Sequence, residues 1–368
     1  MKVVFCLGSL HKGGAERVVS NLANYYAGLG NDVVIITTKS AESSYDLDKK
    51  IKVLSLDTTG ARKSFRNIRR IARLREVIDD VKPDVIFGFL QEPIARLLVA
   101  KALFKNIKKT PTIISIRIDP KKAFSSFKRK MSLPLYNIAN GFVFQTEEAK
   151  KFFNKKIQAR SKVIANPLDP VFYLGNNGDT LKREKRIVAV GRLTRQKNYP
   201  LMLDAFAEVN RKIPGYVLEI YGDGPLKGDI EEYIRKKGLK KNVKLMGEVS
   251  DIKSHFNNAS VFVMTSDYEG LSNALMEAMA VGVPCVSTNS SGGGAASLIE
   301  DGKNGFLVPV GDKAAISEAI EKVLLDDTLA EKFSKAAVKD MKKYRPEKIN
   351  REWEEYASDV MVRHGEAR

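Results

Sequence analysis

The stretch RIVAVG, residues 186–191, is an uninterrupted apolar run of strand length. Similar runs recur behind it, at YVLEIYG (216–222), VKLMG (243–247), SVFVMTS (260–266), PCVST (284–288) and GFLVPV (305–310). Continuous apolar runs, without strict alternation, are typical of strands buried on both faces in a parallel sheet that helices cover. We therefore predict a doubly wound α/β domain over residues 186–345.

The first half of the chain shows the same pattern. Its strand-like runs are VVFCLG (3–8), VVIITT (33–38), VLSL (53–56), DVIFGF (84–89), TIISI (112–116) and GFVFQT (141–146), with helical periodicity at 14–29, 63–80 and 93–104. We predict a first Rossmann-like domain over residues 1–165 and an interdomain linker over 166–185, where turn residues are frequent and no period is visible. An amphipathic helix over about 346–368 is expected to pack back onto the first domain.

The charge of the chain is unevenly distributed. The formal net charge is +18, and residues 1–170 carry 32 Lys and Arg against 15 Asp and Glu, while the remainder is nearly balanced. The excess predicts an anionic partner for the first domain only, which could be membrane lipid, a phosphorylated acceptor or nucleic acid.

Composition also bounds the compartment and the metal chemistry. Cys6 and Cys285 lie in predicted strands, so we expect reduced core residues of a cytoplasmic protein. Two cysteines and three histidines show no zinc-ligand spacing. The N-terminus lacks the features of a signal peptide, and no apolar stretch approaches the ~20 residues that span a bilayer.

Two strand-exit loops carry groups suited to a ligand, because ligands of doubly wound sheets bind beyond the carboxyl ends of the strands. VGRLTRQKN (190–198) holds Arg192 and Lys197, cations suited to a diphosphate; a solvated surface pair is the less favoured alternative. YGDGPLKG (221–228) could admit a ligand close to its backbone at Gly222, or be an ordinary tight turn.

The stretch YEGLSNALMEAMAVGVP (268–284) sets Glu269 and Glu277 eight residues apart. Ser272 or Asn273 is expected to cap a helix, whose free N–H groups at 273–275 would then attract an anion. Two carboxylates beside that anion are better suited to hydroxyl groups than to phosphate. Alternatively, Glu277 is a surface residue of an amphipathic helix.

Two basic segments of the first domain alternate with apolar residues in the way of interfacial membrane segments. Residues 61–80 form a helix with an arginine stripe, and residues 119–136 interleave lysine, arginine and phenylalanine. Solvated helix faces are the alternative. The residues concerned are Arg62, Arg66, Arg69, Arg70, Arg73, Lys121, Lys122, Phe124, Phe127, Lys128 and Arg129.

Taken in order, these stretches resemble retaining glycosyltransferases of family 4. The pair of glutamates, VGRLTRQKN, GDGP, MGEVSD (246–251), DGKNGFLVP (301–309) and GGAERVVSNLA (13–23) follow one another as in that family, across essentially the whole chain. The resemblance implies a GT-B fold, in which two Rossmann-like domains face each other across a cleft. The first domain would bind the acceptor and the second the nucleotide-sugar.

The resemblance also implies roles for residues. Arg192 and Lys197 would bind the donor diphosphate and stabilise the leaving group, Glu277 would bind ribose, and Glu269 the transferred sugar. Other donor contacts would come from Gly13, Gly14, Gly222, Gly247 to Val249, and the backbone of Gly270, Leu271, Ser272, Asn273, Ala274 and Leu275. Asn166-Pro167 matches the hinge of the family. Arg117 stands where many relatives have histidine, and Ser297 where glutamate is frequent.

The implied reaction moves a hexose or N-acetylhexosamine from a UDP-sugar, without a metal ion, to a polyprenyl-diphosphate-linked glycan in bacterial surface polysaccharide assembly. Arg66, Arg69, Arg70 and Arg73 would hold the diphosphate of the acceptor, and the enzyme would be peripheral on the inner face of the plasma membrane. A GDP-sugar, a soluble acceptor or an NAD-dependent oxidoreductase remain alternatives, although GSLHKGG (8–14) departs from the dinucleotide fingerprint. Nothing resembles a nucleic-acid-binding module.

Overall fold

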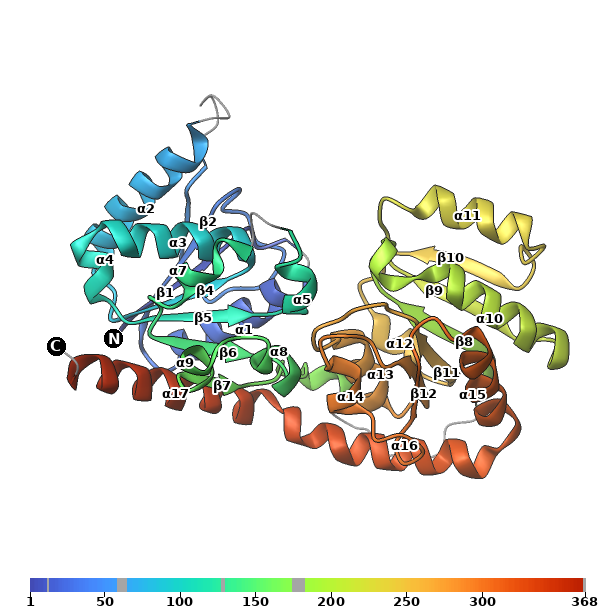
Figure 1. The fold of residues 1–368 in the computed structure, drawn as a ribbon. Helices are drawn as coiled ribbons and strands as arrows, with labels where there is room; N and C mark the ends of the chain where they lie inside the picture. The colour runs from blue at the N-terminus through green and yellow to red at the C-terminus, as the bar shows by residue number, and fades with distance from the viewer. Residues whose placement is uncertain (12, 58–64, 127–129, 174–182, 367–368) are drawn as a thin grey trace. The chain divides into compact units, whose positions relative to one another are not determined.

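The computed structural model describes residues 1–11, 13–57, 65–126, 130–173 and 183–366 (Figure 1). It divides into two compact units. Unit 1 comprises Met1–Pro167 and Pro346–Arg368, and unit 2 comprises Leu168–Arg345. Arg62, Phe127, Lys128 and Arg129 lie outside the described residues, as do 174–182 of the predicted linker.

Unit 1 contains a seven-stranded parallel sheet in the order β3-β2-β1-β4-β5-β6-β7. Because the order reverses between β1 and β4, the loops that follow these two strands diverge at the carboxyl edge of the sheet. The strands are β1 (Lys2–Leu7), β2 (Asp32–Thr37), β3 (Lys52–Ser55), β4 (Val85–Phe89), β5 (Thr112–Ile116), β6 (Gly141–Phe144) and β7 (Ser161–Val163).

Helices connect these strands. They are α1 (Gly14–Gly28), α2 (Arg66–Val81), α3 (Gln91–Leu103), α4 (Lys105–Lys109), α5 (Pro120–Ala123), α7 (Leu133–Tyr136), α8 (Glu147–Lys151), α9 (Lys155–Gln158) and α17 (Pro346–Glu366).

Unit 2 repeats this arrangement with six parallel strands in the order β10-β9-β8-β11-β12-β13. The strands are β8 (Glu184–Val190), β9 (Val217–Tyr221), β10 (Val243–Gly247), β11 (Ala259–Met264), β12 (Cys285–Thr288) and β13 (Phe306–Val308). The helices are α10 (Tyr199–Lys212), α11 (Lys227–Lys236), α12 (Ile252–Phe256), α13 (Asn273–Val281), α14 (Gly294–Leu298), α15 (Lys313–Leu325) and α16 (Asp327–Met341), with short 3-10 turns η1 (Pro170–Phe172), η2 (Arg195–Lys197) and η3 (Lys342–Tyr344).

The predicted fold class, two doubly wound α/β units, is confirmed. Each strand that the sequence predicts is present. In β1, β4, β5 and β11 every residue after the first is buried, as the continuous apolar runs predict. β7 was not predicted: it has only three residues, all half-buried, and no apolar run marks it. Cys6 and Cys285 are both buried and free, and burial raises the pKa of the Cys6 thiol to about 12.

The last helix, α17, belongs to unit 1 and supplies the only tryptophan of the chain (Figure 1). The Trp353 ring is fully buried and lies 5.8 Å from the rings of both Phe87 and Phe89, on β4. Further along α17, the Tyr356 hydroxyl donates to the carbonyl of Arg160 at 2.6 Å and accepts from the amide of Phe142 at 2.9 Å. The C-terminal helix is therefore part of the core of the first sheet.

The prediction that Phe124 contacts the acceptor or the membrane is wrong. Phe124 is only 2% exposed, because it turns inward and packs against Tyr136, Phe152 and Phe153 at ring distances of 5.3 to 5.9 Å. It is a core residue of unit 1 and cannot contact lipid. Within the described ranges, no helix is long and apolar enough to cross a bilayer.

Replacing Trp353 by alanine should destabilise unit 1 by about 3–5 kcal/mol, because the cavity forms between two phenylalanine rings. The matched control on the same helix is Val362→Ala, since Val362 is 59% exposed, and its effect should stay within about 0.5 kcal/mol. Urea unfolding followed by circular dichroism measures both. Equal effects of the two substitutions would show that α17 does not contribute to the core.

Candidate functional site

The candidate site of unit 2 lies at the carboxyl edge of its sheet. The sheet order reverses between β8 and β11, so the loop after β8 and the loop after β11 start from neighbouring strands. Such a switch point is where doubly wound sheets hold ligands. These two loops carry the cations and the first glutamate that the sequence predicts.

An ion pair joins the two loops. Lys197 Nζ lies 2.6 Å from Glu269 Oε2, and each side chain is 15% exposed. The sequence predicts both residues as catalytic but does not predict that they touch, since 72 positions separate them. The Lys197 ammonium is therefore held in place by a carboxylate rather than extended into solvent.

Neutral donors complete the surroundings of the Glu269 carboxylate. Gln196 Nε2 donates to Glu269 Oε1 at 3.1 Å and to the Tyr268 carbonyl at 2.9 Å. Ser266 Oγ donates to Glu269 Oε2 at 3.3 Å. Both carboxylate oxygens thus accept hydrogen bonds, and their positions are fixed. Sequence reasoning missed Gln196 and Ser266, because uncharged side chains beside a motif carry no pattern of their own.

The backbones of the two loops are also joined. The Asp267 amide donates to the Gln196 carbonyl at 2.9 Å, and Asn198 Nδ2 donates to Asp267 Oδ1 at 2.8 Å. Thr265 Oγ1 donates to the carbonyls of Lys197 and Asn198 at 3.0 and 3.1 Å. Lys197 and Glu269 are consequently positioned by a rigid backbone as well as by each other.

Arg192 differs from Lys197 in its surroundings. It lies in the same loop, its side chain is exposed, and among the described residues it forms no ion pair. The predicted pair of cations therefore consists of one cation that a carboxylate already neutralises and one for which the described residues provide no ion pair.

The GDGP turn packs against this loop. At Gly222, where φ is +130°, an added Cβ would lie 2.2 Å from the Gly191 carbonyl oxygen, and at Gly224 it would lie 2.5 Å from that of Leu193. The Leu193 amide donates to the Asp223 carbonyl at 2.9 Å. The glycines therefore permit close approach of one loop to another, which neither of the two sequence interpretations anticipates.

The helix α13 begins at the predicted place. Ser272, and not Asn273, is its cap, and Ser272 Oγ accepts from the Leu275 amide at 3.4 Å. The Leu275 amide is therefore not free for an anion, which corrects the predicted set of donors. Glu277 is buried at 5% exposure, so the alternative of a surface residue is wrong.

The loop that follows β12 packs against the loop that precedes this helix. The Glu269 amide donates to the Ser291 carbonyl at 2.9 Å. A Cβ on Gly294 would lie 1.7 Å from the Gly270 carbonyl oxygen, so only glycine fits there. Ser297, in place of the frequent glutamate, donates from its hydroxyl to the Gly294 carbonyl at 2.7 Å.

The remaining predicted donor contact of unit 2 follows β10. Gly247 has a positive φ of +73°, and its carbonyl accepts from the Gly222 amide at 2.7 Å. Val249, two residues on, is half-buried. β10 neighbours β9, so this segment adjoins the GDGP turn rather than the ion pair.

Three predicted donor residues belong to unit 1. Gly13 precedes α1, its amide donates to the Tyr45 hydroxyl at 2.8 Å, and Gly14 is the first residue of that helix. Arg117 directly follows β5. All three lie at the carboxyl edge of the first sheet.

Arg117 has only uncharged partners. Its guanidinium donates to Asn166 Oδ1 and, at 3.4 Å, to Ser115 Oγ, and its Cζ lies 5.9 Å from the centre of the Trp353 ring. Arg117 Nε is buried without a hydrogen-bond partner, and in the described part of the chain no carboxylate pairs with the side chain. Burial lowers the pKa of the guanidinium to about 9. An anion at this position would offset that cost.

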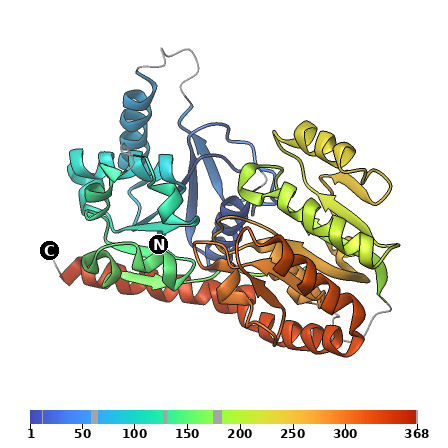
Figure 2. The same cartoon turned by 45° about the vertical axis from the view of Figure 1, so that its right-hand side comes forward.

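Three of the basic residues predicted to contact the acceptor or the membrane form ion pairs with carboxylates, and all of those that the structure describes, except Arg70, are exposed. Arg70 lies 3.7 Å from Asp57, Arg73 lies 2.7 Å from Glu76, and Lys121 lies 2.9 Å from Glu148, which raises the pKa of Lys121. Arg69 and Lys122 are exposed, as is Arg66 at the start of α2. The N-terminal end of α2 rises away from α3 and α4 in both views (Figures 1 and 2).

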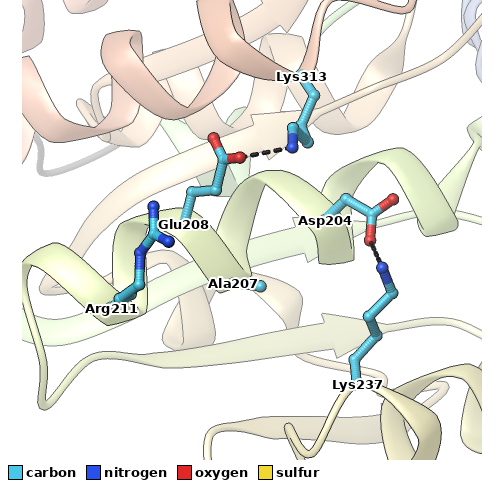
Figure 3. A pocket seen from close by; sticks show the side chains of 6 residues that line it. All are labelled: Asp204, Ala207, Glu208, Arg211, Lys237 and Lys313. Atoms are coloured by element: carbon cyan, nitrogen blue, oxygen red, sulfur yellow. Dashed lines mark ion pairs between the residues drawn. The ribbon is translucent and has the colours of Figure 1, made fainter.

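Two cavities lie apart from these loops. One of about 330 Å³ in unit 2 is lined by α10, α15 and the end of α11, and ion pairs Asp204–Lys237 and Glu208–Lys313 cross its wall at 2.7 and 2.5 Å (Figure 3). One of about 470 Å³ in unit 1 borders the segments that precede β4 and β5, at the opposite edge from Arg117. Neither contains a predicted site residue. Among the described residues, no cluster of three or more His, Cys, Asp or Glu side chains could hold a metal ion.

Lys197→Met should destabilise unit 2 by about 1–3 kcal/mol, because it leaves a largely buried carboxylate without its cation. The double variant Lys197→Met/Glu269→Gln should recover most of that loss, since the unpaired charge is gone. Urea unfolding at neutral pH measures the two. A single variant as stable as the unmodified protein would mean that the ion pair does not hold the loops.

Comparison with known proteins assigns the chain to a group. A family model described as Glycosyl transferases group 1 matches residues 177–340, and one described as Glycosyltransferase Family 4 matches residues 12–172. The chain is 28% identical to the "GalNAc-alpha-(1->4)-GalNAc-alpha-(1->3)-diNAcBac-PP-undecaprenol alpha-1,4-N-acetyl-D-galactosaminyltransferase" of Campylobacter jejuni, over 98% of this chain and 99% of that one. It is 26% identical to the amylovoran biosynthesis glycosyltransferase AmsD of Erwinia amylovora, over 94% and 96%.

Solved structures show the same fold. Anabaena Alr3699/HepE, crystallised with UDP, superposes with a TM-score of 0.80 at 19% identity, over 98% of this chain and 100% of that one. The structure of TarM superposes with a TM-score of 0.78 at 16% identity, over 97% and 98%. At these identities the likeness concerns the fold alone.

Proposed function

The chain belongs to glycosyltransferase family 4, and from this we propose that it transfers a hexose or N-acetylhexosamine, with retention of configuration, from a UDP-sugar to a polyprenyl-diphosphate-linked glycan in bacterial surface polysaccharide assembly. The fold is GT-B and the protein is a glycosyltransferase. The alternative of an NAD-dependent oxidoreductase is thereby set aside. The observation that carries the proposal is the exposed Arg192 in the same strand-exit loop as the Lys197–Glu269 pair, at the switch point of unit 2.

The donor half of the proposal rests on charge and position. Negative charge develops on the departing nucleoside diphosphate as the bond to the sugar breaks, and nearby cations stabilise it. Arg192 and Lys197 lie at the same strand exit. Arg192 can supply charge for which other transferases use a metal ion, and Lys197, although paired with Glu269, adds N–H donors, so we assign no metal. Glu277 would bind ribose, and Arg117 a phosphate or the sugar. HepE was crystallised with UDP, which favours uridine over guanosine.

The hydrogen bonds of Glu269 favour a retaining step without a covalent intermediate over a double displacement. Glu269 Oε1 and Oε2 accept from Gln196, Lys197 and Ser266, so neither oxygen is poised to attack the anomeric carbon. In the proposed step the acceptor hydroxyl attacks on the face from which the diphosphate leaves. The C1–O bond to phosphate breaks, the C1–O bond to the acceptor forms, and the hydroxyl proton passes to the departing phosphate oxygen. Glu269 accepts a hydrogen bond from a sugar hydroxyl.

The acceptor half rests on α2. Phe65 and Ile68 are 53% and 63% exposed, beside the exposed Arg66 and Arg69. Apolar and basic side chains exposed together suit an anionic membrane surface and a lipid-linked diphosphate. The Campylobacter relative is named for a PP-undecaprenol-linked acceptor. The protein would act on the inner face of the plasma membrane, from the cytoplasm.

UDP should bind to the protein, and Arg192→Ala should weaken that binding about 10- to 100-fold, as expected for a lost charge-assisted hydrogen bond. The control is Arg211→Ala, an exposed arginine of the same unit that lines the cavity of Figure 3; its effect should stay below about twofold. Isothermal titration calorimetry gives both dissociation constants. Absence of UDP binding to the unmodified protein would remove the basis of the proposed donor.

Removing charge from α2 should release the protein from membranes. Arg66, Arg69 and Arg73 replaced together by glutamine should lower partition onto phosphatidylglycerol vesicles about 100-fold, at about 1 kcal/mol for each charge, and leave UDP binding unchanged. Replacing Lys105, Lys108 and Lys109 of α4 by glutamine removes the same charge elsewhere in unit 1 and is the matched control. If partition onto the vesicles falls equally in both triple variants, the net charge of the protein, and not α2 in particular, determines membrane binding.

A further inference from the structure

We propose that Glu269 restrains Lys197 so that the free nucleoside diphosphate product is held less tightly than the nucleotide-sugar, which favours product release. The inference rests on the proposed donor site and assigns that site a regulatory property. It starts from the contact between two residues whose expected roles concern different parts of the donor.

Neither partner of the pair can easily leave the other. Gln196 and Ser266 hold the Glu269 carboxylate from two further directions. The Lys197 stem lies close to the Gly191 backbone, since a Cβ built on Gly191 would lie 3.0 Å from Lys197 Cε. A diphosphate that binds Lys197 therefore comes to lie beside a carboxylate that stays in place.

The electrostatic consequence depends on the charge of the ligand. Opposite charges in contact, both largely withdrawn from water, nearly cancel each other's field. A phosphate near Lys197 consequently gains less from an ammonium that already has an anionic partner. This lost attraction grows with ligand charge, and a free nucleoside diphosphate carries about one more negative charge than a sugar diphosphate, because its terminal phosphate has a second ionisation near pH 6.

The pair therefore separates two tasks. Arg192, for which the described residues provide no ion pair, attracts either ligand. The Lys197–Glu269 pair lowers the affinity for the more highly charged product. In many enzymes product release and not chemistry limits turnover, so a device that weakens product binding raises the rate of the cycle.

The test measures the dissociation constant of UDP for Glu269→Gln by calorimetry. The amide keeps the size of the carboxylate and removes its charge, so UDP should bind about 5- to 20-fold tighter, and release more slowly in stopped-flow measurements, although sugar transfer falls. The affinity of Glu269→Gln for a non-hydrolysable UDP-sugar analogue should increase less than its affinity for UDP. The control Asp267→Asn removes a neighbouring charge that bonds to Asn198 and not to Lys197, and should change UDP affinity less than about twofold.

Repeating the substitution in a Lys197→Met background tests whether the effect passes through the lysine. There Glu269→Gln should change UDP affinity less than about twofold. Equal tightening in both backgrounds would mean that Glu269 acts on the phosphate directly, and would overturn the restraint of Lys197. Unchanged or weaker UDP binding by Glu269→Gln alone would overturn the proposal outright. Failure of the unmodified protein to bind UDP is a different result, which refutes the donor assignment itself.

Discussion

The contact between Lys197 and Glu269 is the interaction on which the second unit's site depends. It links loops that follow two strands, β8 and β11, which are distant in sequence and adjacent in the sheet. Because the loops also exchange backbone hydrogen bonds, the charged pair lies on a rigid base and not on mobile side chains. The buried glutamate of α13 and the exposed arginine of the first loop belong to the same two strand exits.

Glycine makes this layering of loops possible. The turn after β9 and the loop after β12 approach neighbouring backbones so closely that any side chain at Gly222 or Gly294 would collide with a carbonyl oxygen. A loop motif rich in glycine is commonly interpreted as room for a ligand. In this protein part of that room is occupied by the protein's own backbone, which fixes the distances among the groups that face the ligand.

The sequence was sufficient for every strand of the two sheets except β7, because continuous apolar runs are typical of strands covered on both sides. The sequence was insufficient where the burial or the contacts of a side chain depend on the element that packs against it. Ile68 and Phe124 both lie in the two segments where basic and apolar residues alternate, yet Ile68 is exposed and Phe124 is in the core, since a sequence pattern does not show what covers a residue. Similarly, the motif identified Lys197 and Glu269 separately, whereas their contact and the supporting Gln196 arise only from the fold.

The position of Trp353 has a spectroscopic consequence. It is the only indole in the chain, it is fully buried, and the Arg117 guanidinium lies 5.9 Å from its ring. Indole emission is sensitive to nearby charge, so a change at Arg117 would alter the fluorescence of the unlabelled protein. Events at the carboxyl edge of the first sheet can therefore be followed optically without any dye, and separately from those in the second unit, which contains no tryptophan.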